Sequence, residues 1–254
     1  MAVDAALLEN PSMFRNPTMR VYRWAPPCIS IGFHQSIQLL DLVRCRAEGV
    51  DVVRRPTGGR AVLHAQEIAY AVIIPEKSDL FAESRHLVYG RIGEGLAAAL
   101  NAIGVPAEWV KRSSEKAIPS ESGLSASCFS STARYELVVG GRKIAGSAQR
   151  IKPEGLLQHG SILIGDSHLG ICRFLKGSAA GNKESMDRLR EKTTTVREHL
   201  DPSVPDSAIS RALRKGMESV FCAHFEDTEP TDEERSLAYS LRLQFLVQPG
   251  EALP

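Results

Sequence analysis

One segment near the middle of the chain limits the fold more than any other, because two extended runs meet there at a pair of glycines. The run Tyr135–Val139 precedes Gly140 and Gly141, and a second run follows at 142–145. Paired glycines adopt the positive φ angles of the tight turns that match the twist of neighbouring antiparallel strands. The segment therefore predicts a β-hairpin, and with it an antiparallel sheet.

Strand patterns dominate the first 165 residues, and helical patterns dominate the remainder. Besides the hairpin, extended runs are expected at 19–24, 28–32, 50–54, 60–64, 68–74, 105–111 and 156–164. Helices are expected at 2–9, 36–48, 84–103, 168–175, 183–190, 207–224 and 231–246. Strands first and helices later predict an α+β fold with a helical C-terminal part.

Composition and charge narrow the functional class. The 254 residues, 43% hydrophobic and 24% charged, are typical of a globular protein with one α/β core. Lys and Arg (31) nearly balance Asp and Glu (30), so no bulk attraction to nucleic acid or an anionic membrane is implied. No apolar run approaches the roughly 20 residues of a membrane-spanning helix, and no basic leader opens the chain. Five irregularly spaced cysteines form neither a disulfide framework nor a metal cluster. We therefore expect a cytoplasmic protein without a metal.

The stretch RRPTGGRAVLH at 54–64 carries the first group of candidate residues. Gly58 and Gly59 let the backbone approach a ligand closely, and exposed amides beside Arg54 and Arg55 can hold an anion or an acyl carbonyl. The simpler alternative is a hairpin turn with solvated arginines. His64 taken alone is more often a satisfied buried histidine.

The stretch GRKIAGSAQR at 141–150 places Lys143 two residues beyond the predicted turn, among small residues. A lysine held in such a cleft loses hydration, which favours its neutral form and suits it to act as a base or a hydrogen-bond donor. The alternative is a solvated lysine on an edge strand that discourages aggregation.

Two further residues are candidates. Cys128 lies in a long Ser-rich segment at 112–131, where a thiol is expected to be accessible, whereas Cys172 and Cys222 each lie on an apolar helical stripe and fit buried hydrophobic positions. A free thiol is only a few per cent thiolate at neutral pH, so a nucleophilic Cys128 needs a base, for which Lys143 is the natural candidate. His159, before the strand glycine Gly160, either faces a pocket or is a packed or solvent-facing histidine.

Taken together, these segments resemble the lipoate/biotin protein ligase and octanoyltransferase superfamily. The matching stretches read MAVDAALLE, RVYRWAPPCISIGFHQ, RRPTGGRAVLH, YELVVGGRKIAGSAQR and LLQHGSILI, in that order from residue 1 to 164. The resemblance implies a mixed, mainly antiparallel β-sheet flanked by helices. It also implies a single catalytic domain over 1–254, with a sheet-rich core at 1–165 and a helical portion at 166–254.

The pair Cys128-Phe129, shortly before YELVV, is similar to the branch of the superfamily that moves octanoyl groups through an acyl-enzyme. This similarity implies that Cys128 is the catalytic nucleophile and Lys143 its catalytic partner. The substrate-binding residues that it implies are Arg55, Thr57, Gly58, Gly59, His64, Gly146, Ser147, Ala148, His159 and Gly160.

The resemblance implies transfer of an octanoyl group from octanoyl-acyl-carrier protein to a lysine of a lipoyl-accepting protein, such as the glycine cleavage H protein. The reaction would serve lipoate biosynthesis and needs no cofactor. Three alternatives stay open: an amidotransferase that moves octanoate from the H protein to a dehydrogenase E2 subunit, an ATP-dependent lipoate–protein ligase, and a non-catalytic acyl-binding module. One departure is Ala65, where relatives commonly carry Asp, which leaves a hydrogen-bonding role near His64 unfilled.

Overall fold

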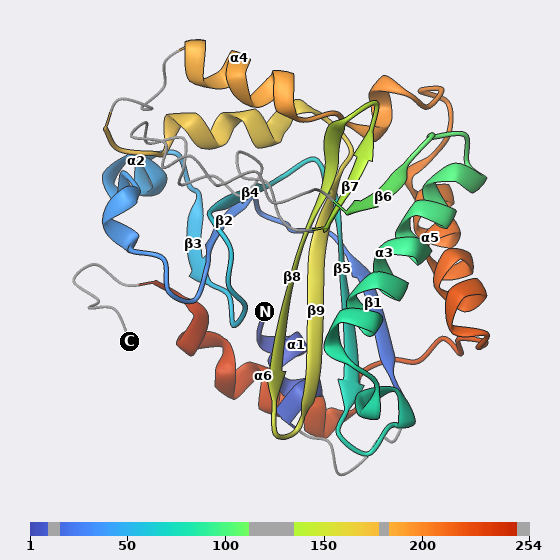
Figure 1. Cartoon of the computed structure of the whole chain (residues 1–254). Coiled ribbons are helices and arrows are strands. Elements are labelled where there is room, and N and C mark those ends of the chain that lie inside the picture. The colour runs from blue at the N-terminus through green and yellow to red at the C-terminus, as the bar shows by residue number, and fades with distance from the viewer. Residues whose placement is uncertain (10–15, 112–134, 178–182, 248–254) are drawn as a thin grey trace.

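The computed structural model describes residues 1–9, 16–111, 135–177 and 183–247, and two β-sheets form its centre (Figure 1). The larger sheet has the strand order β1-β5-β9-β8-β7-β6, and every neighbouring pair is antiparallel. Its strands are β1 (Thr18–Tyr22), β5 (Glu67–Pro75), β6 (Glu108–Lys111), β7 (Tyr135–Val139), β8 (Arg142–Lys152) and β9 (Gly155–Leu163). The predicted mainly antiparallel sheet with helices is confirmed.

The smaller sheet has the order β3-β2-β4 and contains the one parallel pair among the described strands. β2 (Cys28–Ile31) lies parallel to β3 (Asp51–Arg54) and antiparallel to β4 (Val62–His64). Because β2 separates β3 from β4, the glycine loop that joins those two strands crosses the end of β2. The alternative of a simple hairpin turn at 54–64 is therefore wrong.

The predicted glycine hairpin is present between β7 and β8. Gly140 and Gly141 have φ angles of 55° and 76°, and Val139 pairs with Arg142 across the turn. β8 continues well beyond the predicted residue 145, because the small residues that follow stay extended and pair with β9.

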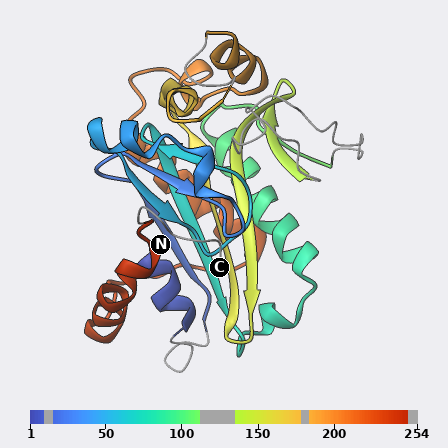
Figure 2. The ribbon, with the colours of Figure 1, turned by 90° about the vertical axis from the view of Figure 1, so that its left-hand side faces the viewer.

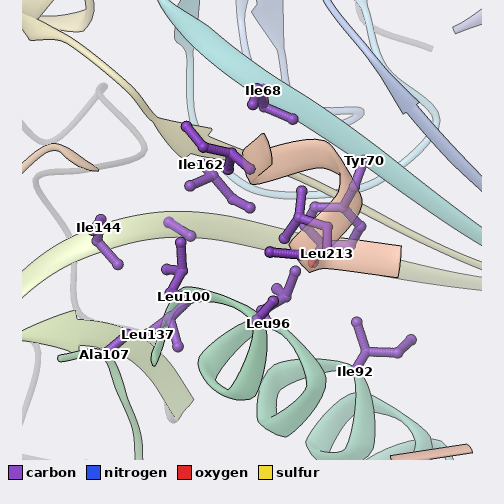
Figure 3. Packing of buried hydrophobic residues seen from close by; sticks show 14 of the residues in the cluster. Ile68, Tyr70, Ile92, Leu96, Leu100, Ala107, Leu137, Ile144, Ile162 and Leu213 are labelled. Atoms are coloured by element: carbon purple, nitrogen blue, oxygen red, sulfur yellow. The ribbon is translucent and has the colours of Figure 1, made fainter. Parts of the chain in front are cut away.

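Helices α3 (Arg85–Ala102) and α5 (Asp206–Phe221) cover one face of the larger sheet and pack against each other. Figure 3 shows the core beneath them, in which Tyr70 and Ile162 of the sheet meet Leu96 of α3 and Leu213 of α5. Each fully buried side chain of this size stabilises the fold by about 1.5–3 kcal/mol relative to its exposure to water.

The first and last helices of the chain lie side by side. α1 (Ala2–Glu9) packs against α6 (Asp232–Phe245) through the cluster of Ala5, Ala6, Ala238 and Leu241. Figure 2 shows the two helices, blue and red, together beside the lower part of the larger sheet. α1 also contacts β5, so the start of the chain is held between the larger sheet and α6.

The remaining helical elements are short. They are η1 (Ile37–Leu39), α2 (Leu42–Ala47), η2 (Asp79–Ala82), η5 (Asp166–Arg173), α4 (Lys183–Lys192) and η6 (Val196–Glu198). The single helix predicted at 36–48 is wrong, because the buried Leu40 forms a β-bridge with Leu175 and Asp41 caps a new helix. The helix predicted at 168–175 is a 3-10 helix that begins at Asp166.

The two cysteines assigned to apolar helical stripes have different surroundings. Cys172 is buried as predicted, but Cys222 is exposed, because it ends α5 in the left-handed conformation with φ 48°. No helix within the described ranges is long and apolar enough to cross a bilayer.

Candidate active site

A cavity between the two sheets brings together residues from all three predicted segments. The predicted residues that line it are Arg55 and His64, Gly146, Ser147 and Ala148, and His159 and Gly160. Other residues that line the cavity were not predicted from the sequence, among them Tyr22, Trp24, Ser30, Ala69 and Ser161. Tyr22, Trp24 and Ser30 fall in the matching stretch at 20–35, but that stretch has no local pattern that marks them as lining a cavity.

Small side chains on one face of the larger sheet leave room for the cavity. Gly146 pairs with Ser161, Ala148 with His159, and these residues face the smaller sheet rather than the core under α3. Gly160 has no room for a side chain, because a Cβ atom there would lie 2.3 Å from the carbonyl oxygen of Gly146. Glycine at this position lets β8 and β9 keep their register beside the cavity.

The glycine loop is held against the smaller sheet by Arg55, which is buried. Its guanidinium donates from Nε to the carbonyl of Gly58 (3.1 Å) and from Nη2 to that of Arg60 (2.6 Å), and from Nη1 to the carbonyl (3.1 Å) and hydroxyl (3.0 Å) of Ser30. Gly59, with φ 95°, brings its carbonyl so close to Gly32 that a Cβ on Gly32 would lie 2.0 Å from the oxygen. Arg55 thus fixes the loop that forms one wall of the cavity.

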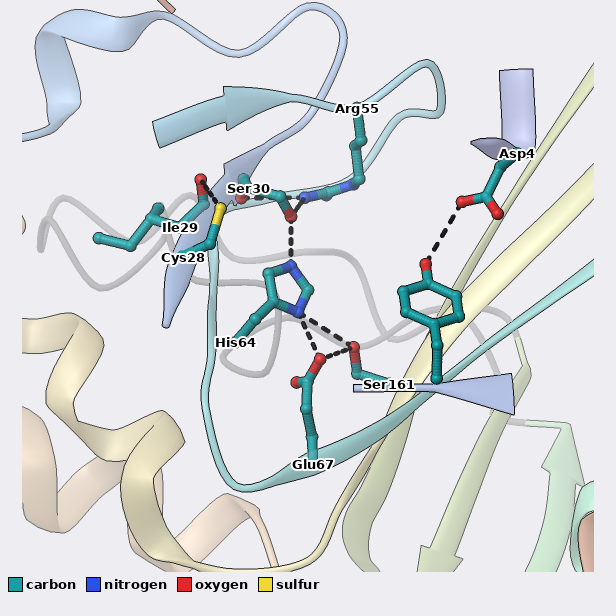
Figure 4. Close-up of polar contacts among 9 residues, drawn as sticks. Asp4, Cys28, Ile29, Ser30, Arg55, His64, Glu67 and Ser161 are labelled. Atoms are coloured by element: carbon teal, nitrogen blue, oxygen red, sulfur yellow. Dashed lines mark hydrogen bonds and ion pairs between the residues drawn. The ribbon is translucent and has the colours of Figure 1, made fainter. Parts of the chain in front are cut away.

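His64 has hydrogen bonds at both ring nitrogens (Figure 4). Its Nδ1 donates to Oε1 of Glu67 (2.5 Å), because a carboxylate can only accept, and the hydroxyl of Ser30 lies 2.7 Å from Nε2. Ser161 donates its hydroxyl to the same oxygen of Glu67 (2.9 Å), and Trp24 stacks on the imidazole at 4.6 Å. Glu67 therefore supplies the carboxylate partner of His64.

His159 is buried as deeply as His64 but has only one bonded ring nitrogen. Its Nε2 lies 2.5 Å from the hydroxyl of Thr57, and its Nδ1 has no partner within the described part of the chain. Burial, which removes water from the charged form, lowers the pKa of His159 from 6.5 to about 3. The ring is therefore neutral throughout the physiological range.

Lys143 is buried and forms an ion pair with the buried Glu136, whose Oε1 lies 3.2 Å from its Nζ. The alternative of an edge-strand lysine is wrong, because β8 lies between β7 and β9. The register of β7 and β8 shifts at Leu137/Val138, so that Ile144 and Ala145 both join the core under α3. This bulge leaves Lys143 on the same face as Gly146, although Lys143 does not itself line the cavity.

Cys128 lies outside the described residues. The described chain stops at Lys111 of β6 and resumes at Tyr135 of β7, and these two residues are paired. Tyr135 directly precedes Glu136 of the buried ion pair.

The other cysteines have surroundings that suppress thiolate formation or lie far from the predicted segments. Burial raises the pKa of Cys28 to about 12 and that of Cys45 to about 11, and it also raises the pKa of Cys172. Cys222, exposed at the end of α5, is the remaining cysteine in the described ranges. Within those ranges, no group of three His, Cys, Asp or Glu side chains is arranged to hold a metal ion.

Comparison with known proteins decides the family. Residues 1–218 match the lipoyl protein ligase A/B catalytic domain. The chain belongs to the lipoyl protein ligase A/B catalytic-domain family.

Several curated relatives of the family are named octanoyltransferase LipM. The protein from Clostridioides difficile is 34% identical over 95% of this chain and 89% of its own length. The protein from Brevibacillus brevis is 37% identical over 95% and 89% of the two chains, and that from Anoxybacillus flavithermus is 36% identical over 92% and 86%. These relatives confirm the predicted superfamily and the prediction of an acyltransferase with octanoyltransferase activity.

Solved structures of lipoate protein ligases share the fold. Lipoate-protein ligase A bound with ATP has a TM-score of 0.72, with 94% of this chain and 87% of that chain covered at 22% identity. The bi-partite lipoate protein ligase of Thermoplasma acidophilum has a TM-score of 0.71, with 94% and 85% covered at 22% identity. At this identity the likeness concerns the fold alone.

Proposed function

We propose that this family member transfers an octanoyl group from octanoyl-acyl-carrier protein to a lysine of a lipoyl-accepting protein, through a thioester on Cys128. The glycine cleavage H protein is the acceptor we propose. The observation that carries the proposal is the buried Lys143–Glu136 pair, which lies on the cavity face of β8 and directly after Tyr135, where the described chain resumes. A nucleophilic thiol needs a neighbouring positive group or base, and the charged amine of Lys143 favours the thiolate form.

The first half-reaction exchanges one thioester for another. The Cys128 sulfur bonds to the octanoyl carbonyl carbon, the bond from that carbon to the pantetheine sulfur breaks, and the pantetheine thiol leaves with a proton. Because the bonds broken and formed are of the same kind, this step needs no ATP. The cavity, whose walls include Val62 and Ala69, takes the octanoyl chain.

The second half-reaction forms an amide. The acceptor lysine nitrogen attacks the octanoyl carbon, the bond to the Cys128 sulfur breaks, and the charged amine of Lys143 gives a proton to the departing sulfur. Lys143 then takes the proton that the new amide nitrogen releases, which restores its ion pair with Glu136. An amide is more stable than a thioester, so this step drives the sequence forward. Backbone amides in the 146–148 stretch of β8 are the donors we propose for the developing oxyanion, where the loss of one donor lowers the rate by about 10²–10³.

Intact-protein mass spectrometry tests the acyl-enzyme. The protein is mixed with octanoyl-acyl-carrier protein without ATP, and we expect a gain of one octanoyl group that hydroxylamine removes. Cys128→Ala should gain nothing, whereas Cys222→Ala, which removes an exposed thiol outside the cavity, should behave like the unchanged protein. An octanoyl group retained by Cys128→Ala, or full transfer by it, would contradict the scheme.

The same assay tests Lys143. Lys143→Ala should fold and bind octanoyl-acyl-carrier protein, yet lose transfer by about 10²–10⁴, the usual contribution of a general acid–base group. An unchanged rate would exclude Lys143 from proton transfer.

The alternative activities require different substrates. A lipoate ligase would need ATP and lipoate, and an amidotransferase would take octanoate from the octanoyl-H protein in preference to the carrier protein. We place the reaction in the cytoplasm, because a nucleophilic thiol works where cysteines are kept reduced.

A further inference from the structure

Two ring N–H groups in the cavity wall have no hydrogen-bond partner. Trp24 Nε1 and His159 Nδ1 are both buried, and neither meets an acceptor among the described residues. A buried polar group without a partner destabilises a fold by about 1–3 kcal/mol, so such groups are rare and call for an explanation. His64, in the same cavity, has a partner at each ring nitrogen.

The hydrogen bond with Thr57 determines which nitrogen of His159 carries the proton. Thr57 is 1% exposed and makes its one side-chain hydrogen bond to Nε2 of His159. If Nε2 carried the proton, the Thr57 hydroxyl proton would have no acceptor and the lone pair of Nδ1 would have no donor. If Thr57 donates to Nε2, a single group is left without a partner, the N–H at Nδ1. The second arrangement leaves fewer buried polar groups unpaired, so His159 presents Nδ1–H as a donor.

A ligand for this cavity must therefore offer an acceptor atom. The indole N–H of Trp24 can only donate, and the hydrogen bond from Thr57 makes His159 a donor as well. The carboxylate of Glu67 accepts from His64 and Ser161 at Oε1, and although its Oε2 is buried without a partner among the described residues, Glu67 does not line the cavity. The polar atom of an acyl thioester is its carbonyl oxygen, which accepts and cannot donate.

We infer that His159 donates its Nδ1 hydrogen to the carbonyl oxygen of the bound acyl group and acts as a catalytic residue. This inference rests on the proposed function and adds a side-chain donor to it. As the nucleophile bonds to the carbonyl carbon, negative charge grows on the oxygen and the hydrogen bond strengthens. When the tetrahedral intermediate collapses, the oxygen returns to a carbonyl, and the proton stays on Nδ1 throughout.

A neutral imidazole suits this role. Its lowered pKa keeps the ring from being protonated in the working pH range, so its donor stays fixed and the ring exchanges no proton with the substrate. Thr57 holds the tautomer, and placing both groups before the substrate arrives avoids reorganisation during the reaction.

The carbonyl stretching frequency of a bound substrate tests the hydrogen bond directly. The probe is S-octanoyl-pantetheine with ¹³C at the carbonyl, bound to the full chain in which Cys128→Ala prevents acylation. We expect a shift to lower frequency on binding, because a hydrogen bond weakens the C=O bond. His159→Phe should abolish the shift, whereas His159→Asn, which can place an amide N–H near the position of Nδ1, should retain part of it.

A matched control is available at another buried histidine. Both ring nitrogens of His168 are engaged, by the carbonyl of Gly165 and the hydroxyl of Thr193, and His168 does not line the cavity. His168→Phe should therefore destabilise the protein and leave the frequency of the bound probe unchanged. An ¹⁵N NMR spectrum of the unchanged protein should show His159 protonated at Nδ1, which keeps the inference testable if His159→Phe fails to fold.

With Cys128 present, His159→Phe should lower kcat/KM by about 10²–10³, the effect of one oxyanion donor. A bound probe whose carbonyl frequency is the same with and without the His159→Phe substitution overturns this inference and leaves the acyl-enzyme intact. A proton on Nε2 in the NMR spectrum also overturns it. Failure of the protein both to bind the probe and to become acylated overturns the proposed function, and this inference with it.

Discussion

Two buried histidines illustrate how similar residues take different roles in this protein. His64 connects Ser30 of β2 to Glu67 of β5, and Ser161 of β9 bonds to the same carboxylate, so the histidine ties the two sheets together. His159 has one bonded nitrogen, and Thr57 of the glycine loop supplies that bond. A histidine with hydrogen-bond partners at both ring nitrogens stabilises the cavity wall. A histidine with a partner at only one ring nitrogen is available to a ligand.

The neutral state of His159 predicts how stability depends on pH. In the folded protein its pKa is lowered to about 3, whereas in the unfolded chain it returns to about 6.5. Between these values the unfolded state binds one more proton than the folded state, so the free energy of unfolding decreases as the pH falls, by up to about 1.4 kcal/mol per pH unit. Urea unfolding at a series of pH values from about 7 down to 4 measures this slope.

Carboxylates also contribute to the change of the free energy of unfolding with pH, so a comparison with a variant decides how much of that change comes from His159. His159→Asn, which cannot titrate, should show a shallower decrease below pH 6.5 than the unchanged protein. The same slope in both proteins would mean that His159 does not resist protonation in the fold.

At the scale of elements, the contact between α3 and α5 depends on glycine. A Cβ on Gly216 of α5 would lie 2.2 Å from the carbonyl oxygen of Gly95 and 2.9 Å from the backbone nitrogen of Ala99, so the two helices approach at backbone distance. This close approach lets Leu96 and Leu213 fill the core from both helices.

We expect Gly216→Ala to destabilise the protein by about 1–3 kcal/mol, because the added methyl group meets backbone atoms that cannot move aside. Gly90→Ala, in α3, is the matched control, since a Cβ there meets nothing within 4 Å. Replacing a helical glycine by alanine in open space should stabilise by about 0.5–1 kcal/mol. Thermal or urea unfolding measures the stability of both variants. A stability change of the same sign in the two variants would contradict the packing explanation.

At the scale of the whole molecule, α1 and α6 form a unit that has few buried residues compared with the central sheet. The contact between α1 and α6 rests on a small buried cluster, mostly alanine. β5 and β9, by contrast, each have a hydrogen-bonded strand on both sides and contribute to the largest core cluster. We therefore expect the α1–α6 pair and the central sheet to unfold independently of each other.

Native-state hydrogen exchange tests this difference. Amides in β5 and β9 should exchange only through global unfolding, and amides in α6 should exchange through a local opening of lower free energy. Leu241→Ala should lower protection in α6 by up to about 2–5 kcal/mol, the range for a buried leucine, and leave β9 unchanged. An equal loss of protection in β9 would show that α6 and the sheet unfold as one unit.

Local features of the sequence predicted most elements because each depends on neighbouring residues. The glycine pair located the hairpin at Gly140 and Gly141, and helical periodicity located α3 and α5 within a few residues. The prediction failed where distant residues decided the outcome: Leu40 pairs with Leu175 and interrupts the helix expected at 36–48. The site residues taken from motifs all stay predictions, although Lys143 lies with Glu136 in a buried pair and several of the others line one cavity.

The sequence by itself determined the family, the α+β class and the order of strands and helices, because motifs, periodicity and turn residues act over short stretches of chain. Only the tertiary structure decided that Glu67 lies within hydrogen-bond distance of His64, that Arg55 holds a loop, and that His159 keeps one donor without a partner among the described residues. The hydrogen bond between Thr57 and His159 joins residues far apart in the chain. Such a bond exists only after strand register and burial have brought its two atoms together, and neither is encoded in any single segment.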